Sequence, residues 1–365
     1  MEEQKKASAR YVGIDLGKRT YEAAIVGKGG KVTMSNGKTF PSARQGLYKK
    51  LRPGDKAALE AGNMAFIMAK EIEAAVEGIQ VYVLNPSHLA VIYASMKKTD
   101  KEDALKLAHI LEDCKEERLP LVPVPSEKEL GRRKLLASYR RAKTGRNRDI
   151  NQLHGLFVSQ GITTKARKDL STEKSREEAA KELSGYEREE AEYLLKSLAL
   201  CEQRIAVLEA RMEEESAGDE EIERLQSIPG VGPKVSFAFA AHVAAERFDN
   251  AGQVSNYLGL VPRVYMSGET VRYGHITKRG NGYVRALLVQ AAWALVWSKK
   301  DEKLKERYNY MTHEKSKSKK TAIVAVARRL AEEMYTLLKH GTKHERKPFE
   351  AGKKAKELAG LAKSA

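Results

Sequence analysis

Four acidic residues have the types and positions to bind divalent metal ions. Asp15 ends a short apolar run and Glu60 ends another. Asp100 and Asp103 are three residues apart, so both carboxylates would lie on one face of a helix. Carboxylate oxygens suit Mg²⁺ or Mn²⁺, and two such ions can hold the attacking and leaving oxygens of a phosphodiester. We therefore predict a catalytic metal site formed by Asp15, Glu60, Asp100 and Asp103.

A simpler explanation covers part of this pattern. Acidic residues favour the first turn of a helix because of the helix dipole, and this alone accounts for Asp100 and Asp103. Asp15 has no such explanation, since it lies in an apolar stretch that predicts a strand. The position of Asp15 therefore favours the metal-site interpretation.

A serine in a basic, glycine-rich segment is the candidate nucleophile. Ser267 precedes a glycine in a predicted turn within residues 257–285. A serine hydroxyl attacks phosphate only when a base takes its proton and cations neutralise the phosphate. Glu269 or His275 would be that base. A Ser-Gly turn without chemistry remains an alternative explanation.

The same segment carries the residues that we expect to contact nucleic acid. Its glycines allow close approach of backbone amides to phosphate, and its cations follow a phosphate backbone. Two tyrosines of the segment, Tyr265 and Tyr273, are alternative nucleophiles. The predicted contacts are Arg263, Arg272, His275, Lys278, Arg279 and Arg285.

Two further segments predict nucleic-acid contacts. The run Ile228-Pro-Gly-Val-Gly232 is typical of a helix-hairpin-helix motif, in which glycine amides at a helix N-terminus face phosphate. An ordinary turn between two helices would have the same residues. An arginine-rich helix upstream is either a second contact surface or a solvated face. The residues concerned are Gly230, Gly232, Lys234, Arg132, Arg133, Arg140 and Arg141.

The elements that must position the acidic residues are those of an α/β domain. Strands are predicted at 11–15, 21–26, 56–60 and 80–84, with a helix at 65–75 between the last two. Thr99, with Glu102 three residues later, forms a capping-box pattern, so a helix begins at Asp100. A hairpin followed by alternating helices and strands is what an RNase H-like (RuvC-like) domain would contain.

Long helices follow this domain. One is predicted from Glu127 to Gln160, and apolar residues spaced alternately four and three apart between Leu194 and Met212 form a heptad seam. The partner of that seam is either the preceding helix or another subunit. We predict an α/β catalytic domain at 1–126, a helical coiled-coil connector at 127–222, a mainly α domain with the serine at 223–342, and a basic tail at 343–365.

The composition narrows the class of protein. The 365 residues carry a formal net charge of +17, which indicates a polyanionic partner such as DNA. The two cysteines, Cys114 and Cys201, fit no metal-binding spacing and predict reduced thiols. No apolar run reaches the ~20 residues of a membrane span, and the charged start is no secretory signal. We expect a cytoplasmic, nucleoid-associated prokaryotic protein without a membrane partner.

An ATPase is a competing interpretation of the first strand. Gly13-Ile-Asp-Leu-Gly17 is similar to the phosphate-loop strand of actin-like ATPases and sugar kinases. Those proteins need a second half-domain with its own phosphate and adenosine loops. Beyond residue 130 the sequence predicts helices and no such loops, so we favour the nuclease interpretation.

The order of these motifs resembles one known family. Gly13-Ile-Asp15, then Glu60, then Lys98-Thr-Asp100-Lys-Glu-Asp103, and finally the segments around Ile228 and Ser267 resemble DEDD-type, Piv-like transposases of the insertion-sequence one-ten family. Gly17 departs from that pattern, but it lies outside the acidic tetrad.

The resemblance implies a specific chemistry. It implies Mg²⁺ bound by Asp15, Glu60, Asp100 and Asp103, and a Ser267 nucleophile that becomes covalently linked to DNA. It also implies composite sites formed by different subunits of a dimer or tetramer, and a bridge RNA, encoded by the element, that pairs with donor and target DNA. Two alternatives remain open: a RuvC-like nuclease or junction resolvase without serine chemistry, and a non-catalytic nucleic-acid-binding protein.

Overall fold

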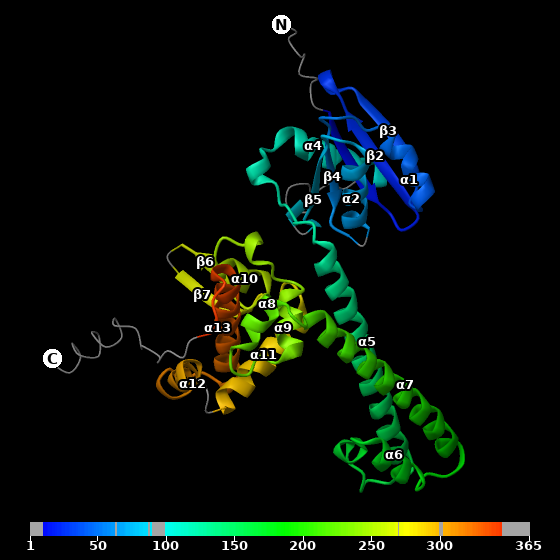
Figure 1. Cartoon of the computed structure of the whole chain (residues 1–365), viewed down its shortest axis with the longest axis vertical. Helices are drawn as coiled ribbons and strands as arrows, with labels where there is room; N and C mark the ends of the chain where they lie inside the picture. Colours follow the sequence, from blue (N-terminus) through cyan, green and yellow to red (C-terminus); the bar gives the residue numbers. More distant parts are fainter. Residues whose placement is uncertain are drawn as a thin grey trace, which may run out of the picture. The chain divides into compact units, whose positions relative to one another are not determined.

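The protein consists of two compact units, residues 1–126 and residues 127–365. The computed structural model describes residues 10–62, 64–86, 88–89, 99–268, 270–298 and 302–344. Figure 1 shows the first unit as a sheet with helices and the second as an almost entirely helical body. Most of the predicted tail, 343–365, lies outside the described residues.

The first unit is built on a five-stranded sheet with the strand order β3-β2-β1-β4-β5. β1 pairs antiparallel with β2, which pairs antiparallel with β3. β4 pairs parallel with β1, and β5 pairs parallel with β4. The strands are β1 (Tyr11–Leu16), β2 (Thr20–Val26), β3 (Val32–Lys38), β4 (Lys56–Glu60) and β5 (Gln80–Leu84).

Helices cover both faces of this sheet because successive strand residues point to opposite sides. Val12, Ile14 and Leu59 belong to a core with α1 (Pro41–Tyr48) and α2 (Ala65–Ala75). Ala58 belongs instead to a core with α4 (Asp100–Asp113). Residues that alternate with the first core, such as Gly13 and Asp15, therefore face α4.

The predicted elements of this unit agree closely with the structure. α2, β4 and β5 have the predicted bounds, and α4 begins at Asp100 with the Thr99 hydroxyl accepting the Glu102 amide at 3.3 Å. The mixed α/β prediction is confirmed. β3 and α1 were not predicted, because β3 is mostly exposed and polar and gives no apolar alternation.

The second unit begins with two long helices that pack side by side, α5 (Glu127–Ser159) and α7 (Gly185–Ser216). Tyr139 donates to Glu209 while Ser197 donates to Asp149, so early α5 faces late α7 and the pair is antiparallel. The seam of α7 is buried here within the same chain: Leu194 and Leu198 in one core, and Ile205 and Met212 in another.

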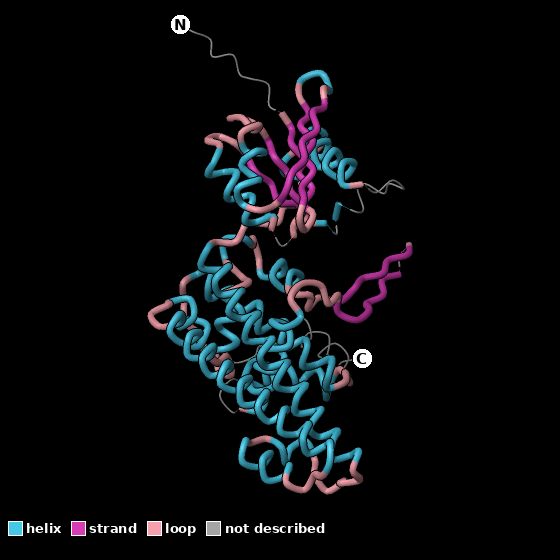
Figure 2. The backbone as a smooth tube through the Cα atoms, turned by 90° about the vertical axis from the view of Figure 1, so that its right-hand side faces the viewer, coloured by secondary structure: helices cyan, strands magenta, loops and turns pink. Residues whose placement is uncertain are grey.

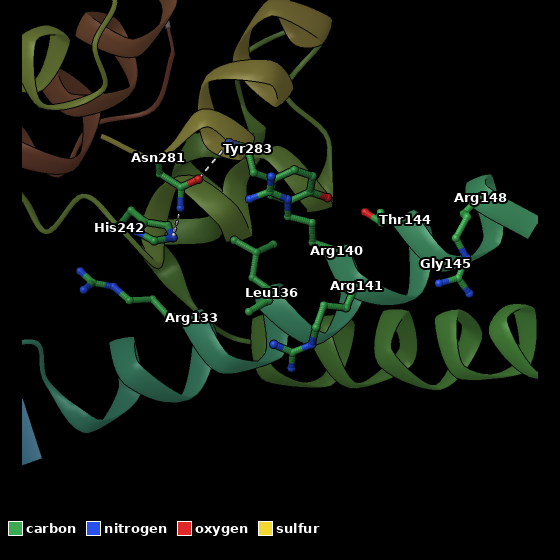
Figure 3. A pocket seen from close by; sticks show the side chains of 11 residues that line it. Arg133, Leu136, Arg140, Arg141, Thr144, Gly145, Arg148, His242, Asn281 and Tyr283 are labelled. Carbon is green, nitrogen blue, oxygen red and sulfur yellow. Dashed lines mark hydrogen bonds between the residues drawn. The ribbon is translucent and has the colours of Figure 1, made fainter. Parts of the chain in front are cut away.

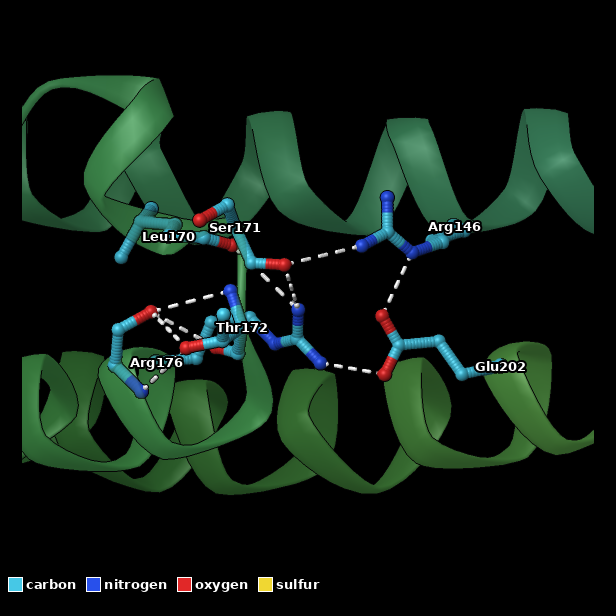
Figure 4. A network of polar contacts seen from close by, with 7 residues as sticks. Arg146, Leu170, Ser171, Thr172, Arg176 and Glu202 are labelled. Carbon is cyan, nitrogen blue, oxygen red and sulfur yellow. Dashed lines mark hydrogen bonds and ion pairs between the residues drawn. The ribbon is translucent and has the colours of Figure 1, made fainter.

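A charged network fastens the far end of this helix pair. Glu202 of α7 accepts from Arg146 of α5 at 2.7 Å and from Arg176 at 2.6 Å (Figure 4). Arg176 belongs to α6 (Glu173–Ala180), and its side chain is 1 % exposed. The network therefore ties three helices together through one carboxylate.

The remaining helices form one core with the near end of this pair. Leu135, Tyr139 and Ile205 of the helix pair share it with Phe237, Leu288 and Leu330 from later helices. The residues predicted as connector and C-terminal domain thus belong to one packed body. The helices are α8 (Glu220–Gln226), α9 (Pro233–Ala240), α10 (Ala251–Tyr257), α11 (Gly282–Trp297), α12 (Glu302–Asn309) and α13 (Lys319–His340).

A two-stranded hairpin extends from these helices (Figure 2). It consists of β6 (Pro262–Ser267) and β7 (Thr270–Ile276), and its residues are largely exposed. Short 3-10 turns lie at Lys28–Gly30, Glu116–Arg118, Arg167–Leu170 and Ala245–Arg247, with a π-helical turn at Tyr310–Glu314. No helix within the described ranges combines the length and apolarity that crossing a bilayer needs.

Candidate active site

Asp15 and Glu60 lie side by side at the ends of neighbouring strands. The last registered pair between parallel β1 and β4 is Ile14 with Leu59, and each acidic residue directly follows its member of that pair. Both side chains face the side of the sheet that α4 covers, because they alternate with core residues of the opposite face. The register thus brings together two of the four predicted carboxylates.

The other two carboxylates come from the first turn of α4. Thr99 caps this helix, so Asp100 is its first residue and Asp103 its fourth. Asp103 forms an ion pair with Lys106, with 2.8 Å between Oδ1 and Nζ. Asp100 is exposed and Asp103 half-buried, so their carboxylates are open to solvent.

A glycine on β1 allows α4 to lie close to the sheet. A β-carbon at Gly13 would stand 1.9 Å from the carbonyl oxygen of Ala104 and 2.5 Å from the amide nitrogen of Ala108. Real side chains do not approach backbone this closely, so only glycine allows this spacing. Ala104 follows Asp103, so this contact sets the position of the helix start relative to Asp15.

The four carboxylates interact electrostatically. The pKa of Asp15 is raised to about 6, chiefly by burial and then by the charges of Asp100, Asp103 and Glu60. A hydrogen bond from the Leu16 backbone acts in the opposite direction. Like charges that are gathered in this way repel one another unless a cation lies among them.

A fifth carboxylate, which the sequence analysis did not identify, faces the same side. Glu22 is the cross-strand partner of Asp15, and opposite residues of an antiparallel pair share a face. Its Oε2 atom is buried and has no hydrogen-bond partner among the described residues. A buried carboxylate oxygen without a donor fits a site for a hard cation.

The carboxylates do not form a closed ligand cage by themselves. Within the described part of the chain, no three acidic, histidine or cysteine side chains converge on a point where one ion would sit. Their mutual repulsion gives a physical reason for this spacing. The donor set still fits Mg²⁺ or Mn²⁺, because it consists of carboxylate oxygens on rigid strand ends and a helix start.

Ser267 lies at the tip of the β6–β7 hairpin. It pairs with Thr270 across the turn, and Gly268 has the left-handed φ of 56° that such tight turns use. The hydroxyl is exposed, and Ser267 lines a hollow of about 420 Å³ with Tyr265 and Arg272. Glu269, one of the two predicted bases, lies outside the described residues.

The hairpin register separates Ser267 from the other predicted base. Ser267 and Arg272 share one face, because the pairs Ser267–Thr270 and Tyr265–Arg272 alternate with Met266–Val271. Val271 and Tyr273 alternate onto the opposite face, and the register shifts between Tyr273 and Ile276. His275 is five residues along β7 from Thr270, about 17 Å at ~3.4 Å per residue. His275 therefore does not reach the Ser267 hydroxyl within one hairpin.

The base of the hairpin is fixed by one arginine and two glycines. Arg285 donates to the carbonyl oxygens of Leu258 and Arg279 at 2.8 Å each. Gly259 and Gly280, both with positive φ, approach neighbouring backbone too closely for a β-carbon. Arg285 thus has a positioning role, whereas the exposed cations predicted to contact nucleic acid are Arg263, Arg272, His275, Lys278 and Arg279.

The first glycine in the turn between α8 and α9 is required for packing. Gly230 has a φ of 83°, and a β-carbon there would lie 3.1 Å from the α11 backbone. Gly232 precedes α9 and meets nothing within 4 Å. Lys234 forms an ion pair with Glu209 at 2.6 Å, so its charge is already neutralised. Gly232 is thus the residue of this turn that is open to a phosphate.

The four predicted arginine contacts of α5 differ in environment. Arg132 is 3 % exposed and pairs with Asp219, so it lacks the accessibility that a nucleic-acid contact needs, and we correct its assignment to a packing role. Desolvation opposes the charge of Asp219, but its hydrogen bonds with Lys128 and Arg132 lower its pKa to about 2. Arg133, Arg140 and Arg141 line a pocket together with His242, Asn281 and Tyr283 (Figure 3).

The chain is similar to transposases over most of its length. A family model described as a transposase of the DEDD, IS110 type matches residues 12–160, and one described as "Transposase IS116/IS110/IS902 family" matches residues 222–309. A probable family 20 transposase of Pseudomonas aeruginosa is 29% identical over 290 residues, which cover 78% of this chain and 83% of that protein.

Two relatives from insertion sequences give the same result. The transposase for element IS1111A of Coxiella burnetii is 27% identical over 265 residues, which cover 72% of each chain. The transposase for element IS1328 of Yersinia enterocolitica is 26% identical over 294 residues, 77% of this chain and 82% of the relative. The fold and these matches define a DNA transposase. The chain belongs to the IS116/IS110/IS902 transposase family, which confirms the resemblance noted in its motifs.

Proposed function

We propose that this transposase cuts and rejoins DNA with a metal-binding carboxylate site and Ser267 as nucleophile. The observation that carries the proposal is the position of Asp15 and Glu60 at the ends of two paired strands, on the face of the sheet that α4, with Asp100 and Asp103 in its first turn, covers. The strand order β3-β2-β1-β4-β5, with helices on both faces, supports an RNase H-like (RuvC-like) domain. The α8–turn–α9 segment supports a helix-hairpin-helix motif in which Gly232 faces phosphate.

The carboxylates act in this scheme as ligands of divalent metal ions. Asp15, Glu60, Asp100 and Asp103 would hold Mg²⁺ or Mn²⁺, and Glu22 would stand beside Asp15. A bound divalent ion supplies Lewis-acid stabilisation of charge on the phosphate oxygens. Lys106 forms an ion pair with Oδ1 of Asp103, so an ion bound through that oxygen would displace Lys106.

Ser267 contributes the covalent step. Its Oγ gives up its proton and forms a bond to phosphorus as one P–O ester bond of the backbone breaks, and the leaving sugar oxygen takes up a proton, so the proton count is unchanged. Arg272, on the same hairpin face, is placed to neutralise the phosphate under attack. The exposed tip of the hairpin leaves the hydroxyl free to enter a site formed with another part of the assembly.

The wider assembly belongs to the same proposal. A homodimer or homotetramer would bring Ser267 of one subunit to the carboxylates of another, and a bridge RNA would select donor and target DNA by base pairing. The net charge of +17 supports this division of labour, because the protein then needs only to hold phosphates. Nuclease treatment of the purified protein, followed by sequencing of any bound RNA, tests the RNA component.

Two substitutions test the chemistry. Ser267→Ala should abolish both strand cleavage and the covalent protein–DNA adduct, whereas Asp15→Asn should abolish cleavage in the presence of Mg²⁺. Thr270→Ala, at the paired position across the turn, is the matched control and should keep both. Full cleavage by Ser267→Ala without any adduct would contradict the serine step and favour a RuvC-like nuclease. A phosphotyrosine adduct would move the role to Tyr265 or Tyr273.

A further inference from the structure

A basic pocket lies between α5 and the start of α11, apart from the carboxylates and Ser267. Its volume is about 520 Å³, and Figure 3 shows the side chains around it. Four arginines, Arg133, Arg140, Arg141 and Arg148, line it from one face of α5. No Asp or Glu is among its lining residues. A cavity of this size accommodates a group as large as a nucleotide.

Two of these arginines bring charge that the described part of the protein does not neutralise. Other arginines of α5 have carboxylate partners: Arg132 has Asp219 and Arg146 has Glu202. Among the described residues, Arg140 and Arg141 lie within ion-pair distance of no carboxylate; Arg141 donates to the Ser138 hydroxyl instead. Unpaired guanidinium groups in a hollow bind phosphate, and bind it bidentately.

Arg140 also makes a cation–π contact with an aromatic ring. Its guanidinium carbon lies 5.5 Å from the ring centroid of Tyr283, the second residue of α11. Burial raises the pKa of the Tyr283 phenol, so it stays protonated. Aromatic rings and arginine planes are the surfaces on which proteins stack unpaired bases.

The floor of the pocket is held by two neutral polar side chains. Asn281 caps α11, because its Oδ1 accepts the amides of Tyr283 and Val284. Its Nδ2 lies 2.9 Å from Nε2 of His242, which must therefore accept. Burial, and secondarily the charge of Arg133, lowers the pKa of His242 to about 4, so the ring is neutral at physiological pH. The α11 N-terminus thus faces the pocket with its position fixed.

We infer that this pocket binds one unpaired nucleotide of a single-stranded nucleic acid. Arg140 and Arg141 hold its phosphate, and its base stacks on the ring of Tyr283 beside Arg140. A fully paired duplex keeps its bases stacked inside and cannot place one on Tyr283. The pocket therefore discriminates single strands from duplexes without reading their sequence.

The experiment measures binding by the full-length protein in EDTA, so no catalysis takes part. The probes are a fluorescent oligothymidylate, the matching oligouridylate, an abasic oligomer with the same backbone, and a duplex of the same length. Arg140→Ala/Arg141→Ala should weaken single-strand binding about tenfold. It should also make the slope of log affinity against log salt concentration less steep by about 1.4. Arg204→Ala/Arg211→Ala, exposed on α7, removes equal charge and should change the affinity by less than about twofold.

The abasic probe isolates the stacking component. Wild-type protein should bind it about tenfold more weakly than the oligothymidylate, and Tyr283→Leu should abolish that difference while Tyr283→Phe keeps it. Stronger binding of the oligouridylate would identify the strand as RNA, and stronger binding of the oligothymidylate as DNA. Unchanged binding by a folded Arg140→Ala/Arg141→Ala protein, or equal losses for duplex and single strand, would overturn the inference. Because EDTA removes catalysis, either result leaves the proposed recombination chemistry untouched.

Discussion

Gly13 of β1 and Ala104 of α4 are in direct backbone contact, with room for no side chain between them. A β-carbon at Gly13 would lie 1.9 Å from the Ala104 carbonyl oxygen. This contact holds the start of α4, with Asp100 and Asp103, beside the strand that carries Asp15. The spacing of the carboxylates therefore depends on a residue that has no side chain of its own.

Gly13→Ala should lower both stability and activity. The added methyl group meets backbone rather than a movable side chain, so α4 has to shift, at a cost of about 1–3 kcal/mol in the free energy of unfolding. DNA cleavage should fall further than the folded fraction accounts for. Gly46→Ala, on α1 with nothing within 4 Å, is the control and should be neutral or stabilising. Equal effects of the two substitutions in urea unfolding would contradict this account.

Asp15→Asn should stabilise the metal-free protein in a pH-dependent way. Because the pKa of Asp15 is raised from 3.8 to about 6, its neutral form favours folding; that contribution is complete below pH 3.8 and is lost as pH rises from there through about 6. In EDTA the variant should have a higher Tm than wild type, by more at pH 8 than at pH 5, and the difference should vanish only below about pH 4. Glu73→Gln, exposed on α2, should show no such difference.

Adding metal should give wild type, rather than the Asp15→Asn variant, the higher Tm. Mg²⁺ or Mn²⁺ at pH 8 should raise the Tm of wild type and leave the Asp15→Asn variant nearly unchanged, since binding to the native state stabilises it. The measurement is a thermal unfolding series in EDTA and in each metal. An equal rise in both proteins would place the metal elsewhere.

His242 should make the second unit sensitive to mild acid. Its pKa is lowered from 6.5 to about 4, so protonation favours the unfolded chain, and stability falls as pH drops from 6.5 towards 4. From pH 7 to pH 5 this amounts to about 2 kcal/mol in the free energy of unfolding. His242→Gln keeps an acceptor for Asn281. Between pH 7 and pH 5 its free energy of unfolding, measured in urea, should fall by correspondingly less than that of wild type.

Arg132→Met should destabilise the protein without weakening nucleic-acid binding. The substitution leaves the buried Asp219 with Lys128 as its remaining cation, at 2.7 Å, and we expect a loss of about 3 kcal/mol. Arg140→Ala/Arg141→Ala should show the reverse: a small loss of stability and a large loss of affinity. If the Arg132→Met protein were folded but bound nucleic acid more weakly, the original assignment of Arg132 as a nucleic-acid contact would be correct.

Local rules were sufficient to predict the elements that carry the acidic residues. Short apolar runs predicted β4 and β5 with the bounds that the structure has, and the Thr99 cap predicted the start of α4. These signals involve neighbours a few residues apart, so they are complete in the sequence. The motif order likewise indicated the transposase family before any fold was known.

Tertiary structure decided which of several equivalent side chains are available for function. Arg132 and Arg140 are two turns apart on one helix, yet Asp219 neutralises the first, while the second makes a cation–π contact with Tyr283 and has no carboxylate partner among the described residues. The strand register placed Glu22 beside Asp15 and His275 away from Ser267. Charges and rings that are distant in the chain determine such environments, and no local pattern records which of them will meet.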